Sequence, residues 1–417
     1  LRSSLRALES KSSLKCGLGE IETNAKVAFR DGGTVALDAQ ASTSGFNIGA
    51  LLPESGLGSA AFMADASLSI AAKDFSGKLD TDIDFIEYGT DRLSGVSLKA
   101  SKEGSRVVAE VHSDDPNLLL SANGVAVMSG VHRLHDTPLQ FTANVDLKRF
   151  VPEAFGIAPK LGGYDFSVYA DINLSGQNLD AMLGSVSVRD FCMHRHDGKT
   201  LTLQYLDVIS EQEVTGEQSL SIKSDWLEGR LAGQYHLTRL PQAFTSLLIR
   251  VIPSLSTLLP SGPETDDNFD FNFTLAADNT LPEFFNLPVR LLVPVPVHGA
   301  LSDSTGTASL NIDVPYLQQG KDKLIRDIHL SASLDASTGI SRLDFSTLMP
   351  GKKGDTGVRL NVNGIRDDLL TDIGWTMHRP GRYDGSISLS TSLQPAYRGM
   401  SPDLEVKINP SVIHVAD

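Results

Sequence analysis

The feature that most constrains this chain is a strict alternation of apolar and polar residues between Tyr164 and Leu174. Its apolar members are Tyr164, Phe166, Val168, Ala170, Ile172 and Leu174. A period of two places successive side chains on opposite faces of an extended strand. A turn follows the segment, and Val186 and Val188 then repeat the pattern. The alternation therefore predicts a β-hairpin that is apolar on one face and hydrated on the other.

Similar alternation recurs along the chain and predicts an all-β fold. Examples are Ala64–Ile70, Phe269–Leu275 and Leu404–Ile408. Glycine, asparagine, aspartate and proline separate these segments, as hairpin turns require. Strand and turn patterns also recur at a spacing of about 100–135 residues, which is typical of a repeat architecture. We therefore expect three β units, covering residues 1–135, 136–262 and 263–417.

Composition excludes several classes of protein. The 417 residues carry a net charge of -15, so the chain lacks the basic footprint of a nucleic-acid-binding protein. It begins at Leu1 without the apolar core of a signal peptide, and it has no apolar run long enough to span a membrane.

Because it ends within a strand-like pattern, we expect a piece of a longer protein. Cys16 and Cys192 form no disulfide framework and are expected to be free, although pairing stays open.

The sequence offers only weak candidates for chemistry. Asp80, Asp82 and Asp84 would share a strand face, but the glycine turn and distal glutamate of a calcium-binding EF-hand are missing. His194 and His196 would also share a face, yet no third ligand follows at a fixed spacing. We therefore expect no catalytic residue, no metal site and no cofactor, and we do not expect an enzyme.

One segment departs from the β pattern. Leu240–Pro260 carries apolar residues at helical spacing and predicts an amphipathic helix with a kink at Pro253. Ser261–Asp267 is interpreted as a linker. The helix could be a core element on a sheet, a plug over an apolar groove, or a helix on a membrane surface. The candidate plug residues are Phe244, Leu248, Val251 and Leu255.

A central stretch resembles a known family of envelope proteins. Residues 173–191, NLSGQNLDAMLGSVSVRDF, are followed by LTLQYLDVIS, LSIKSDWLEGRLAGQYHL and VIPSLSTLLP. This arrangement is similar to the middle of a TamB-type translocation and assembly module, which belongs to the AsmA-like proteins. GWTMHRPGRYDGSISLS with INPSVIHVAD looks like a further unit of the same kind. The resemblance rests on hydrophobic pattern and covers most of the chain.

The resemblance implies an elongated, curved, repeating β-sheet (a β-taco or β-groove) with an apolar concave face. It further implies a periplasmic segment of a protein anchored in the inner membrane. Such a segment would form a hydrophobic conduit to the outer membrane for phospholipid transfer or outer-membrane protein assembly. The implied partners are phospholipid acyl chains and an outer-membrane assembly protein of the Omp85 type. The expected groove-lining residues are Tyr164, Phe166, Val168, Ala170, Ile172, Leu174, Val186 and Val188.

Two alternatives remain open at this point. In a structural or adhesive β-sandwich array of a cell-surface protein, the apolar faces would close against each other about 10 Å apart. A lectin-like or carbohydrate-active β protein would need aromatic stacking residues and paired carboxylates. The chain has only two tryptophans and no convincing carboxylate pair, which disfavours this second alternative.

Overall fold

In a computed structural model, the chain forms two compact units, Leu1–Asp207 (unit 1) and Val208–Asp417 (unit 2). The structure describes residues 7–30, 33–71, 74–88, 91–128, 139–156, 162–214, 216–259, 266–320, 323–351, 354–377, 383–394 and 403–415. The expected boundaries near residues 135 and 262 lie outside the described residues, as do residues 261–265 of the expected linker. The division into three repeating units therefore stays a prediction.

Unit 1 is an antiparallel meander in which each strand from β1 to β11 pairs with the next one in sequence. Its strands are β1 (Ala7–Cys16), β2 (Gly19–Phe29), β3 (Val35–Asn47), β4 (Leu57–Ile70), β5 (Phe75–Tyr88), β6 (Asp91–Glu103), β7 (Arg106–Asp115), β8 (Leu118–Met128), β9 (Leu139–Phe150), β10 (Tyr164–Gly176) and β11 (Leu183–Arg195). Its short helices are η1 (Pro53–Ser55), η2 (Pro152–Phe155) and η4 (Leu179–Ala181). Strand β12 (Thr200–Gln212) contains the boundary between the units.

Unit 2 has the same β pattern and, in its described residues, two α-helices. Its strands are β13 (Gln218–Ser224), β14 (Leu227–Gln234), β15 (Asn268–Leu275), β16 (Val289–Leu291), β17 (Val295–Ser302), β18 (Thr307–Gln319), β19 (Lys323–Asp335), β20 (Ile340–Met349), β21 (Thr356–Ile365), β22 (Asp368–Met377), β23 (Tyr383–Gln394), β24 (Asp403–Ile408) and β25 (Val412–His414). Its helices are η5 (Leu237–Arg239), α1 (Leu240–Val251), η6 (Pro253–Thr257) and α2 (Thr280–Phe284). Pairing is antiparallel throughout, with β17 beside β15, β16 beside β18, and both β24 and β25 beside β23.

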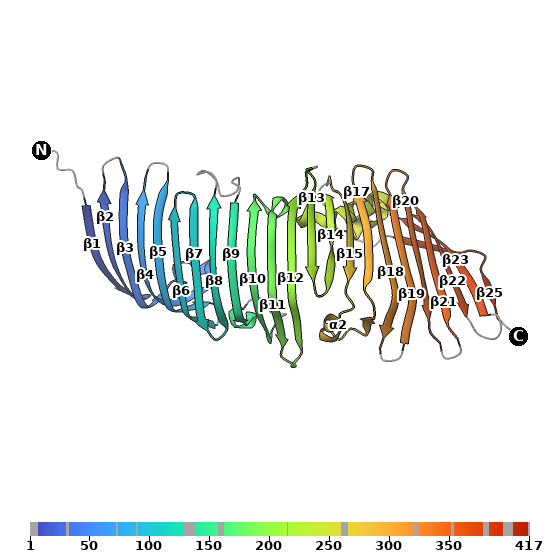
Figure 1. Ribbon diagram of the computed structural model, residues 1–417, viewed down its shortest axis with the longest axis horizontal. Helices are drawn as coiled ribbons and strands as arrows, with labels where there is room; N and C mark the ends of the chain where they lie inside the picture. Colours follow the sequence, from blue (N-terminus) through green and yellow to red (C-terminus); the bar gives the residue numbers. More distant parts are fainter. Residues whose placement is uncertain are drawn as a thin grey trace. The chain divides into compact units, whose positions relative to one another are not determined.

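Each unit is built on an open, curved layer of strands, as Figure 1 shows. In the described residues, strands contact their partners within the layer, and no second sheet packs on it. The predicted all-β fold is confirmed. The closed β-sandwich alternative does not describe these units, because it requires two sheets face to face.

Helix α1 forms the core of unit 2 by packing on the sheet. Proline at position 241 suits the first turn, and Pro253 cannot continue the helix, which ends at Val251. Ala243, Leu247 and Val251 lie one turn apart and are fully buried. The other buried members of this core cluster are Leu231, Phe269 and Leu301 on strands and Tyr235 just after β14. The expected helix is thus confirmed over its first twelve residues, and the reading as a core element is the one that the packing supports.

Helix η6 extends α1 along the turns at one margin of unit 2. The Arg250 guanidinium lies 3.3 Å from the Asp303 carboxylate in the turn between β17 and β18. Further on, the backbone N–H of Ser254 donates to Asp367 (2.8 Å), between β21 and β22. The Ser254 hydroxyl donates to the carbonyl of Leu393 (3.3 Å), near the end of β23. The α1–η6 segment therefore runs along this margin, past the strand ends from β14 to β23.

Candidate functional site: an uncovered apolar face

One face of unit 1 carries a continuous row of apolar side chains. Residues directly opposite each other on paired strands point to the same face, so the register traces the row from β2 to β11. Its members are Ala25, Ala39, Ala66, Leu79, Ala100, Ala109, Gly124, Ala143, Ile172 and Val186. All of them are half-buried. Because no second sheet of the described residues covers them, their partial burial comes from neighbouring side chains on a curved sheet.

The opposite face of unit 1 is polar at the adjacent positions. A second row, one residue along each strand, runs through Asn24, Gln40, Asp65, Asp80, Lys99, Glu110, Asn123, Asn144, Asp171 and Ser187. Most of these side chains are exposed, and Asp80 lies 3.6 Å from Lys99. The sheet of unit 1 thus has one apolar face and one polar face, and the charged side chains of the second row lie on the polar face.

The residues expected to line a groove share the apolar face. Ile172 stands opposite Ala143 and Val186, and Ala170 stands opposite Val188. The register shifts beside β10 arise from extra residues in β9 and β11, where Asp190 has a φ of 49°. Strand β10 itself therefore alternates without interruption. The expected residues Tyr164, Phe166, Val168, Ala170, Ile172, Leu174, Val186 and Val188 are all half-buried.

Unit 2 has an equivalent row with larger side chains. From β13 to β23 its members are Ile222, Gly229, Phe273, Val297, Ile312, Leu330, Phe345, Leu360, Ile373 and Ile387. Some aromatic rings lie against glycines of the next strand: a Cβ on Gly299 would meet the Phe271 ring at 2.3 Å, and one on Gly385 would meet Trp375 at 2.4 Å. These glycines let the rings lie against the sheet and leave the face above open.

Helix α1 covers only part of the apolar face of unit 2. Its core cluster extends to Phe271 and Phe273. Among the described residues, the positions of the row from Ile312 to Ile387 do not belong to that cluster. Of the candidate plug residues, Val251 is buried, whereas Phe244 is 37% exposed and contacts the Phe269 ring edge-on (5.9 Å between centroids). Leu248 and Leu255 are half-buried.

Burial also shapes the chemistry of this core. The Tyr235 ring meets Phe269 edge-on, with 6.4 Å between their centroids. Burial raises the pKa of the Tyr235 hydroxyl, and the nearby Arg230 partly opposes this change. The phenol therefore stays neutral, which suits its place beneath α1.

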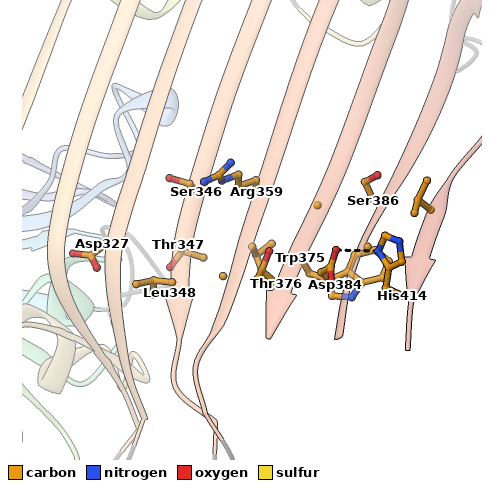
Figure 2. A pocket seen from close by; sticks show the side chains of 15 residues that line it. Asp327, Ser346, Thr347, Leu348, Arg359, Trp375, Thr376, Asp384, Ser386 and His414 are labelled. Atoms are coloured by element: carbon orange, nitrogen blue, oxygen red, sulfur yellow. Dashed lines mark hydrogen bonds and ion pairs between the residues drawn. The ribbon is translucent and has the colours of Figure 1, made fainter. Parts of the chain in front are cut away.

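A separate depression of about 590 Å³ lies in unit 2, lined by residues of β19 to β23 and of β25 (Figure 2). Trp375 and Thr347 come from the apolar face, and Ser346 and Arg359 come from the polar one. The His414 ring lies 3.1 Å from Asp384 and is 42% exposed. An exposed His–Asp pair is a weak basis for acid–base chemistry, because exposure leaves it screened by water. We therefore do not treat this depression as the candidate site.

The structure does not bring the aspartates and histidines that the sequence suggested as metal ligands into a cluster of three or more ligands among the described residues. Asp80, Asp82 and Asp84 are exposed on β5. His194 contacts Thr200 and Cys192, at 2.9 and 3.3 Å. Within the described part of the chain, the one cluster of at least three metal-type ligands is His236, Asp266 and Asp267. This cluster was not predicted from the sequence, because its members lie about thirty residues apart and meet only where β14 and β15 pair.

The two cysteines are free and lie in different environments. Cys16 is exposed on β1. Burial raises the pKa of the Cys192 thiol, and the Asp165 carboxylate raises it further. We expect a maleimide near neutral pH to modify Cys16 several-fold faster than Cys192, measured by mass spectrometry of digested protein. In urea the two rates should converge, and equal rates in the folded protein would contradict the described placement of Cys192.

Comparison of the chain with protein-family models, curated proteins and solved structures gives no match. Among the described residues, no helix has both the length and the hydrophobicity needed to cross a bilayer. The function must therefore be argued from the apolar face itself.

Proposed function

We propose that this chain is a periplasmic segment of a TamB-like envelope protein and that its apolar face carries phospholipid acyl chains. The observation that supports this most directly is the half-buried apolar row of each unit, which α1 covers only in part in unit 2. An exposed apolar surface of this extent is typical of a binding site. Each CH₂ group removed from water onto such a surface contributes about 0.8 kcal/mol.

A sheet with one apolar face and one polar face suits a conduit better than a closed pocket. Contacts between acyl chains and methyl groups are non-directional, so a lipid shifted along a row exchanges one set of contacts for a similar set. A polar headgroup can stay in water at the open side. We further propose that the whole protein is anchored in the inner membrane and docks on an Omp85-type partner at the outer membrane, where it aids lipid transfer or protein assembly.

Purification without detergent tests this proposal. We expect the protein purified from bacterial cells to retain phospholipid, detected by native mass spectrometry and by lipid extraction. A structural or adhesive array would purify without lipid. Lipid-free protein that also fails to take up a fluorescent fatty acid would contradict the proposal.

A further inference from the structure

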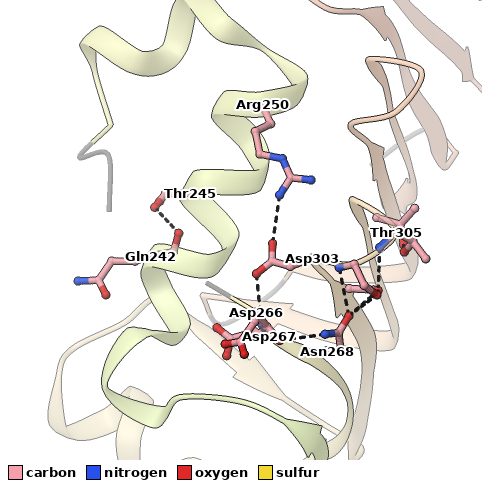
Figure 3. A network of polar contacts seen from close by, with 11 residues as sticks. Gln242, Thr245, Arg250, Asp266, Asp267, Asn268, Asp303 and Thr305 are labelled. Carbon is pink, nitrogen blue, oxygen red and sulfur yellow. Dashed lines mark hydrogen bonds and ion pairs between the residues drawn. The ribbon is translucent and has the colours of Figure 1, made fainter. Parts of the chain in front are cut away.

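A cluster of three potential metal ligands lies at the base of the segment that carries α1. His236 follows the end of β14, and Asp266 and Asp267 precede β15. The two strands pair at this point, with Gln234 opposite Asn268. One ligand atom from each of the three residues lies within 4.8 Å of the others. Figure 3 shows the two aspartates side by side, below Asp303 and Arg250.

Asp267 is the central member, because its carboxylate is completely buried. Its Oδ1 lies 2.8 Å from His236 Nδ1 and accepts the backbone N–H of His236 (3.0 Å). Its Oδ2 is buried and has no hydrogen-bond partner among the residues that the structure describes. Buried carboxylate oxygens are nearly always paired, because losing water without a new partner costs free energy. The unpaired oxygen therefore points to a missing positively charged or proton-bearing group.

The polar groups beside Asp267 are already engaged. The Asp267 backbone N–H donates to Asp303 Oδ2 (3.2 Å). The other carboxylate oxygen of Asp303 lies 3.3 Å from Arg250, so this guanidinium is directed at Asp303. Gln234 donates to Asp266 (2.8 Å). Within the described residues, a donor for Asp267 Oδ2 is thus lacking, whereas His236 Nδ1 faces both aspartates, at 2.8 and 3.8 Å.

We propose that His236, Asp266 and Asp267 bind a divalent transition-metal ion, with Zn²⁺ as the preferred occupant. An imidazole nitrogen and two carboxylates are ligands that Zn²⁺ accepts, with water in the fourth position. Asp266 is 72% exposed, so its side provides access for the ion and for that water. Ca²⁺ is disfavoured because it takes six to eight oxygen ligands, and Mg²⁺ because it prefers oxygen to imidazole.

The ion would hold together the two ends of the segment that carries α1. His236 stands immediately before η5 and α1, and Asp267 stands immediately before β15. Coordination would therefore fix the base of this segment and favour the docked position of α1. A ligand that binds the folded state and not the unfolded state raises the unfolding temperature. The proposal is independent of lipid binding, since the cluster lies at the segment base and involves no member of the apolar rows.

Titration of the intact chain with ZnCl₂ tests the site. After treatment with EDTA and gel filtration, we expect calorimetry to give one Zn²⁺ per chain with micromolar affinity or better. The unfolding transition followed by tryptophan fluorescence should move to higher temperature with Zn²⁺ and stay unchanged with Ca²⁺ or Mg²⁺. The absence of Zn²⁺ binding would overturn the proposal.

Three variants locate the ion. We expect His236→Ala and Asp266→Asn each to weaken Zn²⁺ binding at least tenfold, and Asp266→Asn keeps the buried Asp267 intact. The matched control is His329→Ala, which removes another histidine beside an aspartate, 2.6 Å from Asp313, where the described part of the chain offers no third ligand. His329→Ala should bind Zn²⁺ like the unmodified chain. Unchanged binding in both site variants, or lost binding in the control, would place the ion elsewhere and overturn the assignment.

Discussion

Replacing Ile172 and Leu330 together by aspartate is expected to remove most of the phospholipid that co-purifies with the protein. Ile172 lies in the apolar row of unit 1, and Leu330 lies in that of unit 2. A carboxylate on either row is hydrated, and an acyl chain that binds there must displace this water. Removing water from a charged group costs free energy, so acyl chains should bind the variant rows more weakly. We expect bound lipid per protein to fall at least about tenfold, equivalent to about 1.4 kcal/mol. Lipid extraction followed by mass spectrometry measures the loss.

The control places the same charges on the other face. Asn173 adjoins Ile172 along β10 and is exposed, and Ser333 is exposed on β19 opposite Arg342. We expect the Asn173→Asp and Ser333→Asp double variant to retain lipid. Circular dichroism establishes that both double variants are folded. Equal lipid content in the two would contradict the proposed conduit, as would a charge at Val168 that leaves lipid binding intact.

Truncation of Leu247 is expected to destabilise unit 2 strongly. The side chain is completely buried between α1 and the sheet. Replacing a buried leucine by alanine removes apolar contacts and leaves a cavity, which together cost about 2–5 kcal/mol. Urea unfolding measures the loss, and fluorescence reports on unit 2 because both tryptophans, Trp226 and Trp375, lie there.

A second leucine in the same segment serves as the comparison. Leu258 lies just beyond η6 and is 55% exposed. Leu258→Ala should change the free energy of unfolding by less than about 0.5 kcal/mol, as exposed positions usually do. If both variants lost the same small amount, α1 would not be packed on the sheet as described.

Alternation in the sequence predicted many of the strands, whereas strand β1 was missed. Tyr164–Leu174 was expected as a strand and lies within β10, because its alternation matches a sheet with one hydrated side. Strand β1 was not expected, because its sequence ALESKSSLKC has no regular alternation of apolar and polar residues. It is held by backbone pairing with β2, which leaves no trace in side-chain hydropathy.

The candidate site was predictable only as far as alternation extends. Opposing residues such as Ile172 and Val186 could be placed on one face from the hairpin alone. The long rows could not be predicted, because they depend on the register of each successive pair. The extra residues in β9 and β11 could not be foreseen either. Likewise, helical spacing indicated α1, but the candidate plug residues include only Val251 of its buried stripe, which also contains Ala243 and Leu247.

Because the strands of unit 1 pair strictly in sequence order, the width of its sheet can change by whole hairpins. Each strand widens a sheet by about 4.8 Å, so a hairpin adds or removes about 10 Å. Loss of β6 and β7 would bring β5 beside β8 with chain directions preserved, and Leu79 could then stand opposite Gly124. The apolar row would survive such a deletion with two members fewer. Gain or loss of hairpins could therefore adjust the reach of unit 1 in even steps, with the chemistry of both faces conserved.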